Sequence, residues 1–456
     1  MHVSINCALA MKINRIKIRN FRGFKEEEII FPTNMTVVIG NNTAGKTTLL
    51  GALQVGIGAY LQSMRSLPPG RAYKRQFSET DCYMRFDPVK RDYFKERENT
   101  RIDLEADFFD TIVDDNGHFV LNPIPKKIKW YREMTAKGST LFNKECAGEL
   151  MNQVEKLEKG RESHDANAIL PIVLFFGTNR IDNQYRTAKK VKERLTRIDK
   201  AYKAALNDDV DFAGAMDWMK RYEKNIKDGR EFEGTREAFL EALGNAIPAM
   251  QEIELDHGEL EALVSVTGRQ PERHHYSYMS DGFKAVINIV SEIAYRCIQL
   301  NGFLKENAVK MTPGIVMIDE VDLYLHPHWQ RHILDDLQQA FPRIQFVVTT
   351  HSPFIVQSLK KGQLVSFDEN VNENGEPYKE SLEDIAGTRM GLDVEIRSQR
   401  FNEMVHAADE FFEALDSGNS DANELKQKLD LIEAEFSEDP AYVAFIKSQY
   451  HSKNKA

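Results

Sequence analysis

The fold is decided by one stretch of the sequence, Gly40-Asn41-Asn42-Thr43-Ala44-Gly45-Lys46-Thr47, which has the pattern GxxxxGK followed by Ser or Thr. A strand is predicted before it, at 36–39, and a helix after it, from Lys46 to about residue 61. Glycines let backbone N–H groups approach a phosphate, and the helix N-terminus adds a favourable dipole. We therefore predict an ATP-binding loop, 40–47 with Thr48, in which Lys46 reaches the β and γ oxygens and Thr47 coordinates Mg²⁺.

Two acids follow a predicted buried strand in a second stretch, Ile315-Val316-Met317-Ile318-Asp319-Glu320. A cation or a reacting water at the carboxyl end of a buried strand would explain why two carboxylates are placed there. We predict that Asp319 holds Mg²⁺, directly or through water, and that Glu320 is the catalytic base that accepts the proton of the attacking water. A solvated strand end is the plainer alternative, and it is disfavoured beside a phosphate-binding loop.

A histidine follows the next predicted strand, in the stretch Val348-Thr349-Thr350-His351-Ser352-Pro353. A histidine in this place can form a hydrogen bond with the γ-phosphate and respond to its loss. A single histidine is more often structural, but the position directly after this strand favours a catalytic role for His351.

Composition is typical of a soluble globular protein with two or three domains. Of the 456 residues, 42% are hydrophobic and 29% are charged, and no apolar run reaches the roughly 18 residues of a membrane span. Four scattered cysteines without a CxxC pair argue against a zinc site or a disulfide framework. We therefore expect a cytoplasmic protein with no membrane partner. The net charge of −10 restricts any contact with nucleic acid to a local basic patch.

Strands and helices follow one another in the order of an α/β protein. Residues 62–100 are charged and irregular and indicate a surface excursion. Strands are predicted at 101–109, 127–133 and 168–176, completing a small β lobe beside the nucleotide. A strand pair is expected around 253–266. The remaining elements are helix 281–300, strand 315–318, helix 328–340 and strand 344–348, which is the parallel-sheet half of the domain.

These elements predict four segments. The head has an N-terminal part, 1–179, and a C-terminal part, 249–380. An inserted helical subdomain, 180–248, separates them because its sequence is charged and helix-forming. The last segment, 381–456, is predicted as an acidic tail with two or three amphipathic helices beyond Arg397.

The order of the motifs resembles the RecF, SMC and OLD branch of the ABC ATPases. Met279-Ser280-Asp281-Gly282-Phe283-Lys284, between the phosphate-binding loop and the two acids, is similar to the signature of that family. The resemblance implies an ABC-type P-loop head, built from a β lobe and a RecA-like parallel sheet. It also implies a homodimer in which Ser280 and the N–H groups of Asp281 and Gly282 contact the γ-phosphate bound to the other subunit. Taken alone, Ser-Asp-Gly is an ordinary helix N-cap.

Two further stretches are similar to loops of the same family. Leu323-Tyr324-Leu325-His326-Pro327 resembles the D-loop, which communicates across the dimer. Asn20-Phe21-Arg22-Gly23-Phe24 resembles the opening loop, which implies that Arg22 reaches the nucleotide and that an aromatic ring stacks on adenine. The glutamine of the transporter-type Q-loop has no counterpart. The chain lacks sustained heptads, a CxxC hook and a TOPRIM pattern, which excludes long coiled-coil arms and a nuclease site of that type.

Within this branch the chain resembles the ATPase subunits of Septu-type anti-phage defence systems, on the basis of residues 171–180, the Ser280-Asp281-Gly282 signature and the acidic tail. That resemblance implies a regulatory ATPase that forms a homodimer or a higher homo-oligomer and controls a partner HNH nuclease acting on DNA. The alternative is a stand-alone RecF-like ATPase of DNA repair and recombination. A transporter engine is disfavoured, because the signature and the D-loop differ from transporter usage.

A basic segment lies between Arg180 and Lys203, where nine Lys and Arg residues stand against three acidic ones. On a helix this spacing distributes positive charge around most of the circumference, which suits a phosphate backbone. DNA is therefore a candidate partner of this segment. The alternative is a helical face that is merely solvated.

Overall fold

The computed structural model describes residues 11–68, 70, 73, 75–96, 98–109, 111–113, 119–121, 124–163, 165, 168–179, 195–207, 212–228, 233–256, 259–265, 270–368, 376–391, 399–417, 422–435 and 443–448. The chain divides into two compact units, Met1–Ile385 and Ala386–Ala456. The first unit is the head and carries all the motifs described above. The domain boundaries predicted at 180, 249 and 381 stay predictions.

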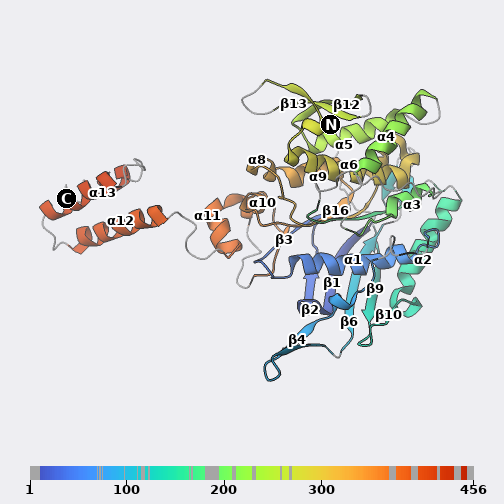
Figure 1. The fold of residues 1–456 in the computed structure, drawn as a ribbon, viewed down its shortest axis with the longest axis horizontal. Coiled ribbons are helices and arrows are strands. Elements are labelled where there is room, and N and C mark those ends of the chain that lie inside the picture. Colours follow the sequence, from blue (N-terminus) through green and yellow to red (C-terminus); the bar gives the residue numbers. More distant parts are fainter. Residues whose placement is uncertain are drawn as a thin grey trace. The chain divides into compact units, whose positions relative to one another are not determined.

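A five-stranded parallel sheet forms the centre of the head (Figure 1). Its order is β11 (Ile172–Phe176), β15 (Gly314–Ile318), β16 (Ile344–Thr349), β3 (Met35–Ile39) and β17 (Leu364–Ser366). Every residue of the first four strands is buried, as expected for strands covered on both faces. Because β16 lies between β15 and β3, the three motifs that follow these strands meet at one edge of the sheet.

A second, antiparallel sheet forms the β lobe. Its order is β10 (Thr140–Leu141), β9 (Lys126–Met134), β6 (Thr100–Phe108), β1 (Met11–Phe21) and β2 (Phe24–Ile30). Buried and half-buried residues alternate strictly along β6, as in a strand with one covered face. Strand β11, predicted as part of this lobe, pairs instead with β15 in the central sheet. Its unbroken apolar run suits a strand that is covered on both faces, so that prediction was wrong.

Helix α1 (Lys46–Ser63) lies between the two sheets (Figure 1). It is buried from Leu49 to Leu61, so it shows no distinct polar face. The β lobe approaches it closely at Gly56, whose backbone oxygen accepts a hydrogen bond of 2.8 Å from the Trp130 ring nitrogen. The helix that begins in the phosphate-binding loop is therefore held from both sides.

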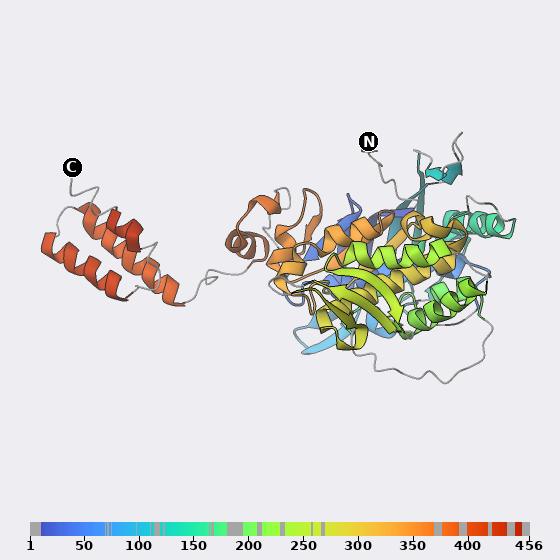
Figure 2. The ribbon, with the colours of Figure 1, turned by 90° about the horizontal axis from the view of Figure 1, so that it is seen from above.

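Further helices pack around the two sheets of the head. They are α2 (Lys144–Glu162), α3 (Arg197–Tyr202), α4 (Phe212–Lys227), α5 (Glu233–Ala246), α6 (Asp281–Asn301), α7 (Ala308–Met311), α9 (Ile333–Ala340) and α10 (Pro353–Gln357). Helices α3, α4 and α5, green in Figures 1 and 2, pack directly on α6. A buried arginine of α6 helps to hold α3 there: Arg296 binds Glu292 of its own helix at 2.6 Å and donates to the Ala201 oxygen of α3, also at 2.6 Å.

Three element predictions need correction. The strand pair near 253–266 has a third member, giving a sheet of β12 (Met250–Asp256), β13 (Glu259–Val264) and β14 (Glu272–His275). The helix predicted at 328–340 is two helices, α8 (Pro327–Gln330) and α9, because the chain turns at Arg331 and His332. The excursion at 62–100 contains a hairpin of β4 (Met84–Asp87) and β5 (Asp92–Lys95). A further small hairpin pairs β7 (Thr111–Val113) with β8 (Phe119–Leu121).

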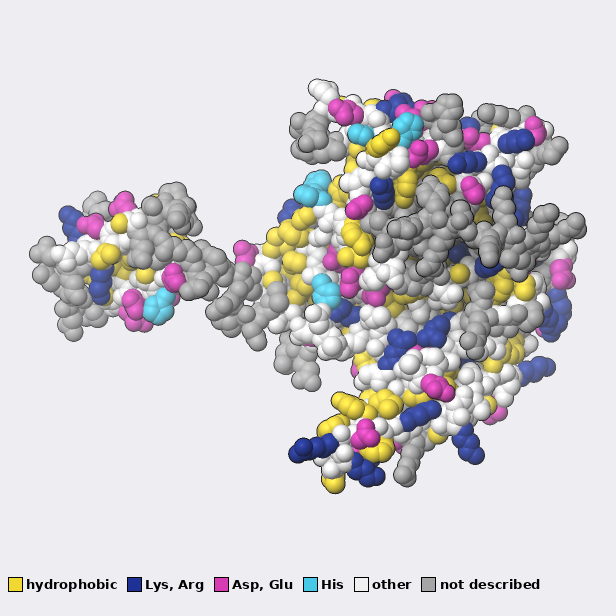
Figure 3. Space-filling view, in the orientation of Figure 1, with side chains coloured by type: hydrophobic (Ala, Val, Ile, Leu, Met, Phe, Trp, Pro, Cys, Tyr) yellow, Lys and Arg dark blue, Asp and Glu magenta, His cyan; other side chains and the backbone are white. Residues whose placement is uncertain are grey.

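The β4–β5 hairpin is exposed on both faces. Met84, Phe86 and Tyr93 remain 46%, 49% and 63% exposed, and their apolar surface lies beside Lys and Arg at the lower tip of the molecule in Figure 3. The sequence did not predict this strand pair, because each strand has only four residues and an alternation of charged and apolar residues over so short a length is a weak signal.

The second unit contains the predicted amphipathic helices of the tail, α12 (Gln399–Ser417) and α13 (Ala422–Glu435), after the short α11 (Leu382–Asp384) that ends the head. Buried side chains of the two helices form a small core of their own, with Met404, Phe411 and Leu429 among its members. The tail therefore folds around its own apolar contacts.

Candidate active site

The phosphate-binding loop has the backbone that its glycines predict. Gly45 has a φ of 111°, and a Cβ placed there would lie 2.4 Å from the ring of Phe24. Any side chain at this position would therefore both strain the backbone and collide with the β lobe. Phe24, one of the two aromatic residues of the opening loop, thus packs against the phosphate-binding loop, and its ring centroid lies 5.4 Å from that of Phe367.

Lys46 is buried and turned back onto its own loop. Its Nζ donates hydrogen bonds to the backbone oxygens of Gly40 at 2.5 Å and Asn41 at 3.1 Å. Burial lowers the pKa of Lys46, whereas the carboxylates of Asp368, Asp319 and Glu320 raise it. Asp368 was not singled out in the sequence, yet its Oδ1 accepts a hydrogen bond of 3.0 Å from the Asn41 N–H. The loop is therefore held by a carboxylate at the end of β17.

Asp319 lies at the centre of a hydrogen-bond network that joins the ends of β15 and β16 to the start of α1. Its Oδ2 accepts from the Thr47 hydroxyl at 3.0 Å, and its Oδ1 accepts from the Thr349 hydroxyl at 2.5 Å. The Thr349 hydroxyl oxygen in turn accepts a hydrogen bond from the backbone N–H of Glu320 at 2.8 Å. Thr349 thus fixes the positions of both acids relative to the phosphate-binding loop.

Glu320 has a left-handed backbone, with a φ of 48°. Non-glycine residues in this region carry strain of roughly 1–3 kcal/mol, and such strain is concentrated at functional sites. The next residue, Val321, donates from its N–H to the backbone oxygen of Thr349 at 2.9 Å, so β16 holds the turn on both sides of Glu320. Glu320 itself is partly exposed.

His351 is exposed at the same edge of the sheet. Its loop is fixed by the two neighbours of the histidine. Thr350 donates to the Asp322 carboxylate at 2.5 Å and accepts from the Ser352 N–H at 3.0 Å. The D-loop and the histidine loop are therefore connected through Thr350. Thr349 and Thr350 were not predicted as site residues, although their position as polar residues at the end of an apolar strand was a signal in the sequence.

Ser280 is the exposed N-cap of α6, and its side chain makes no capping hydrogen bond. The helix start packs against the D-loop, since a Cβ on Gly282 would lie 2.8 Å from the Tyr324 oxygen. Asp281, the first residue of the helix, is also exposed. Within the described residues no hydrogen bond joins this signature to residues 40–47. The structure therefore places Ser280 on the surface, beside a loop and not in the phosphate-binding loop of its own chain.

Arg22 lies beside α1 and is held by a buried carboxylate. Its Nε donates to Asp81 at 2.8 Å, and Arg75 binds the same carboxylate at 3.2 Å. One of its Nη atoms lies 2.9 Å from the position of a Cβ on Gly51. Its role at the nucleotide stays a prediction.

The basic segment is described only in part: Arg197, Lys200 and Lys203 are described, whereas 180–194 lie outside the described residues.

The oxygen atoms around Asp319 fit a magnesium ion. A carboxylate and a hydroxyl are hard ligands, and Mg²⁺ is commonly held by one or two protein oxygens together with the phosphates of the substrate. Among the described residues no group of three or more His, Cys, Asp and Glu forms a cage for a metal. Thr47 and Asp319 are the residues that would hold the ion.

A sequence profile described as an AAA domain matches residues 15–245 of the chain. The chain belongs to the AAA-domain ATPases. A second AAA-domain profile matches residues 189–357, which include the two acids and the histidine. The head is thus an AAA-domain ATPase with a P-loop, and the chain resembles PtuA.

Curated relatives of this AAA-domain ATPase come from bacteria. "Retron Vc95 probable ATPase" of Vibrio cholerae is 22% identical over 79% of this chain and 74% of its own length. "Retron Ec83 probable ATPase" of Escherichia coli is 23% identical over 76% of this chain and 70% of its own length. "Septu protein PtuA" of Bacillus thuringiensis is 32% identical over 35% of this chain and 42% of its own length.

Solved structures similar to this ATPase include two SMC heads. The SMC head domain of Thermotoga maritima covers 80% of this chain and 97% of its own, with 14% identity and a TM-score of 0.37. The Smc head with an extended coiled coil from Pyrococcus furiosus covers 78% and 93%, with 14% identity and a TM-score of 0.43. Among the described residues, no helix has the length and apolar character that crossing a membrane would require.

We expect Thr349→Val to slow ATP hydrolysis by roughly 10- to 100-fold, because small displacements of catalytic groups have effects of this size. The substitution keeps the shape of a fully buried side chain but removes the hydroxyl between Asp319 and Glu320. The free energy of unfolding should fall by about 1–3 kcal/mol, since a buried N–H and a carboxylate lose a partner. Steady-state kinetics and denaturant unfolding measure the two effects.

Thr36→Val is the matched control. Thr36 is equally buried on the neighbouring strand β3, and its hydroxyl has no hydrogen-bond partner within the described structure. Its loss should leave both quantities almost unchanged, while Thr349→Ser should restore most of the turnover. Equal effects of the two valine substitutions would show that Thr349 has no special role.

Proposed function

We propose that this chain is the ATP-binding and ATP-hydrolysing regulatory subunit of an anti-phage defence complex, which dimerises around ATP and controls a partner nuclease acting on DNA. One observation carries the enzymatic part: Asp319 accepts a hydrogen bond from Thr47 of the phosphate-binding loop, while the Thr349 hydroxyl holds both Asp319 and Glu320. The defence role rests on the similarity to PtuA and to retron ATPases. The enzymatic part and the defence role rest on separate observations, so each can be tested without the other.

Hydrolysis is proposed to use the residues at the edge of the sheet. Lys46 exchanges the oxygens of Gly40 and Asn41 for phosphate oxygens, which is favourable because the phosphate is charged and the backbone oxygens are not. Asp319 and Thr47 would hold Mg²⁺, which would supply positive charge to the phosphates of the substrate. Glu320 then accepts the proton of the attacking water, and His351 forms a hydrogen bond with the γ-phosphate.

The second subunit is proposed to complete the pocket. Ser280 is exposed, its hydroxyl makes no cap bond, and it begins a helix of 21 residues whose positive end favours an anion. In a two-fold dimer each signature faces the phosphate-binding loop of its partner. The D-loop contact at Gly282 supports this arrangement, because it ties the signature to the turn that follows Glu320.

Mixing two inactive variants tests the shared pocket. Lys46→Ala removes the lysine of the phosphate-binding loop, and Ser280→Glu places a negative charge where the γ-phosphate would approach. Each variant alone should be inactive. In a mixed dimer, one site combines the intact loop of one chain with the intact Ser280 of the other, so random mixing should restore about one quarter of wild-type turnover. The rate of ATP hydrolysis after co-refolding or co-expression measures this.

No recovery on mixing, despite mixed dimers demonstrated by tagged co-purification, would contradict the shared pocket, and full activity of Ser280→Glu by itself would mean that each chain hydrolyses ATP alone. The nuclease part needs a different experiment. Co-expression with an HNH protein encoded beside the gene, followed by purification and DNA cleavage with and without ATP, should show a complex whose cleavage depends on nucleotide. ATP hydrolysis stimulated by DNA ends without any partner would instead favour the stand-alone repair ATPase.

A further inference from the structure

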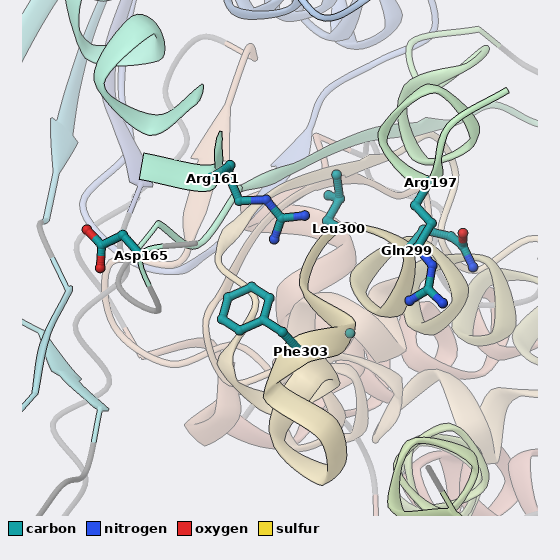
Figure 4. Close-up of a pocket in the computed structure, with 7 residues that line it drawn as sticks. Arg161, Asp165, Arg197, Gln299, Leu300 and Phe303 are labelled. Atoms are coloured by element: carbon teal, nitrogen blue, oxygen red, sulfur yellow. The ribbon is translucent and has the colours of Figure 1, made fainter. Parts of the chain in front are cut away.

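A cavity of about 330 Å³ lies where the ends of α2 and α6 meet the start of α3 (Figure 4). Arg161 comes from the last turn of α2, Arg197 begins α3, and Gln299 lies near the end of α6. Phe303 follows α6 and forms the floor. None of these residues belongs to the motifs of the ATP site. The cavity is therefore a second candidate binding site in the head.

Two guanidinium groups line this cavity. In Figure 4 the Arg161 side chain extends from its helix into the space between Phe303 and Arg197, while Asp165 points away from it. Burial lowers the pKa of Arg161, and the nearby charge of Arg197 lowers it further. Two positive groups that border the same hollow repel one another, and an anion between them would remove that cost.

Arg161 is half-buried without an acidic partner. Within the described residues no carboxylate forms an ion pair with its guanidinium, and its neighbour is the Phe303 ring, 5.3 Å from ring centroid to guanidinium carbon. A cation that loses hydration without gaining a counter-charge is unfavourable. The cation–π contact offsets only part of this loss. An anion bound in the cavity would supply the counter-charge that the described residues do not give Arg161.

The walls of the cavity are fixed by hydrogen bonds. A capping box holds the start of α3, where the Thr196 hydroxyl accepts from the Asp199 N–H at 3.1 Å and the Thr196 N–H donates to the Asp199 carboxylate at 2.8 Å. Asn301, at the end of α6, exchanges two hydrogen bonds of 2.9 Å with the backbone of Leu170. Arg161 and Arg197 are thus presented by rigid elements, which reduces the entropy lost on binding.

We propose that this cavity binds the phosphate group of a nucleotide, either free or within a nucleic-acid strand. The planar forks of two guanidinium groups match phosphate oxygens in geometry and charge. The volume lies at the lower end of ligand pockets, which suits one nucleotide. The ring of Phe303, 41% exposed, offers an apolar surface to a base, and the Gln299 amide offers a donor and an acceptor. Arg197 also belongs to the basic segment predicted as a candidate partner of DNA.

A purely structural role of the arginines is the competing explanation. Positive side chains near the C-terminal ends of α2 and α6 complement the negative ends of the helix dipoles. That role predicts a loss of stability on substitution and no change in the affinity for any ligand. Binding measurements therefore separate the two explanations.

The test uses the full chain carrying Lys46→Ala, so that nucleotides do not occupy the ATP site. Two probes are titrated: dAMP, by calorimetry, and a short fluorescent single-stranded oligonucleotide, by anisotropy. In this background, Arg161→Gln with Arg197→Gln should weaken binding of at least one probe about tenfold or more. Lys159→Gln is the matched control, because Lys159 lies on the same helix but is 70% exposed and pairs with Glu155. The control should change either affinity by less than about twofold.

The two probes identify the source of the phosphate. Loss of dAMP binding indicates a free nucleotide, and loss of oligonucleotide binding alone indicates a strand. Unchanged affinity for both probes in a folded double variant, judged by thermal melting, would overturn the proposal, as would an equal loss in Lys159→Gln. If the double variant does not fold, Arg161→Lys replaces it: this change keeps the charge but removes the fork, so binding should still weaken severalfold.

Discussion

Glu320→Gln should lower the turnover number for ATP by roughly 10²- to 10⁴-fold while ATP binding is retained, because a positioned general base contributes about this factor. The amide has nearly the shape of the carboxylate, so the left-handed turn and its hydrogen bonds to Thr349 should persist. ATP should therefore accumulate unhydrolysed on the protein and, if the second subunit completes the pocket, hold the dimer closed. Single-turnover kinetics, equilibrium binding of ATP and size-exclusion chromatography measure these three outcomes.

Asp335→Asn provides the control for Glu320→Gln. Asp335 carries an exposed carboxylate paired with Lys360 on the surface, and it should have no measurable effect on hydrolysis. Multiple turnover at the wild-type rate by Glu320→Gln would refute the assignment of the base. Loss of ATP binding in the same variant would instead show that the carboxylate positions the substrate.

Much of the head could be predicted from the sequence because its signals are local. The phosphate-binding loop needs glycines at fixed positions, and a strand covered on both faces needs an unbroken apolar run. These features made the motif strands 36–39, 315–318 and 344–348 readable, and the structure confirms them as β3, β15 and β16. The neighbours of a strand depend on long-range packing, and for that reason β11 was placed in the wrong sheet.

The connections within the site could not be predicted in the same way. Thr349 lies about 30 residues after Asp319 and Glu320 and bonds to both, and nothing in a single sequence specifies such a contact. Asp368 is separated from Asn41 by still more sequence, yet it holds the phosphate-binding loop. Motifs therefore identify the groups that act, whereas the groups that position them depend on which strand ends become neighbours.

Lys46→Ala should abolish measurable ATP binding, lowering the affinity by at least about 100-fold, because the substitution removes the one cation that the phosphate-binding loop itself carries. The folded protein should tolerate the change. The pKa of Lys46 lies below its ordinary value of 10.5 in the folded state, so its positive charge opposes folding at every pH below that folded pKa. Its removal relieves this penalty and offsets the two lost hydrogen bonds to Gly40 and Asn41.

Thermal melting with and without Mg²⁺-ATP separates binding from folding for Lys46→Ala. A ligand at 100 times its Kd stabilises the folded state by about 2.7 kcal/mol, so wild-type protein should melt at a clearly higher temperature when ATP is added. Lys46→Ala should melt as the ligand-free wild type does, and ATP should not shift it. Glu320→Gln should show the full shift, because ATP binds before the step in which the Glu320 carboxylate acts.

A nucleotide-dependent shift in Lys46→Ala would mean that other groups hold the phosphates, and the backbone N–H groups of residues 43–47 would then be the main binding contacts. The opposite responses of the two variants follow from one geometry, in which the cation lies within the loop and the base lies at the end of a different strand.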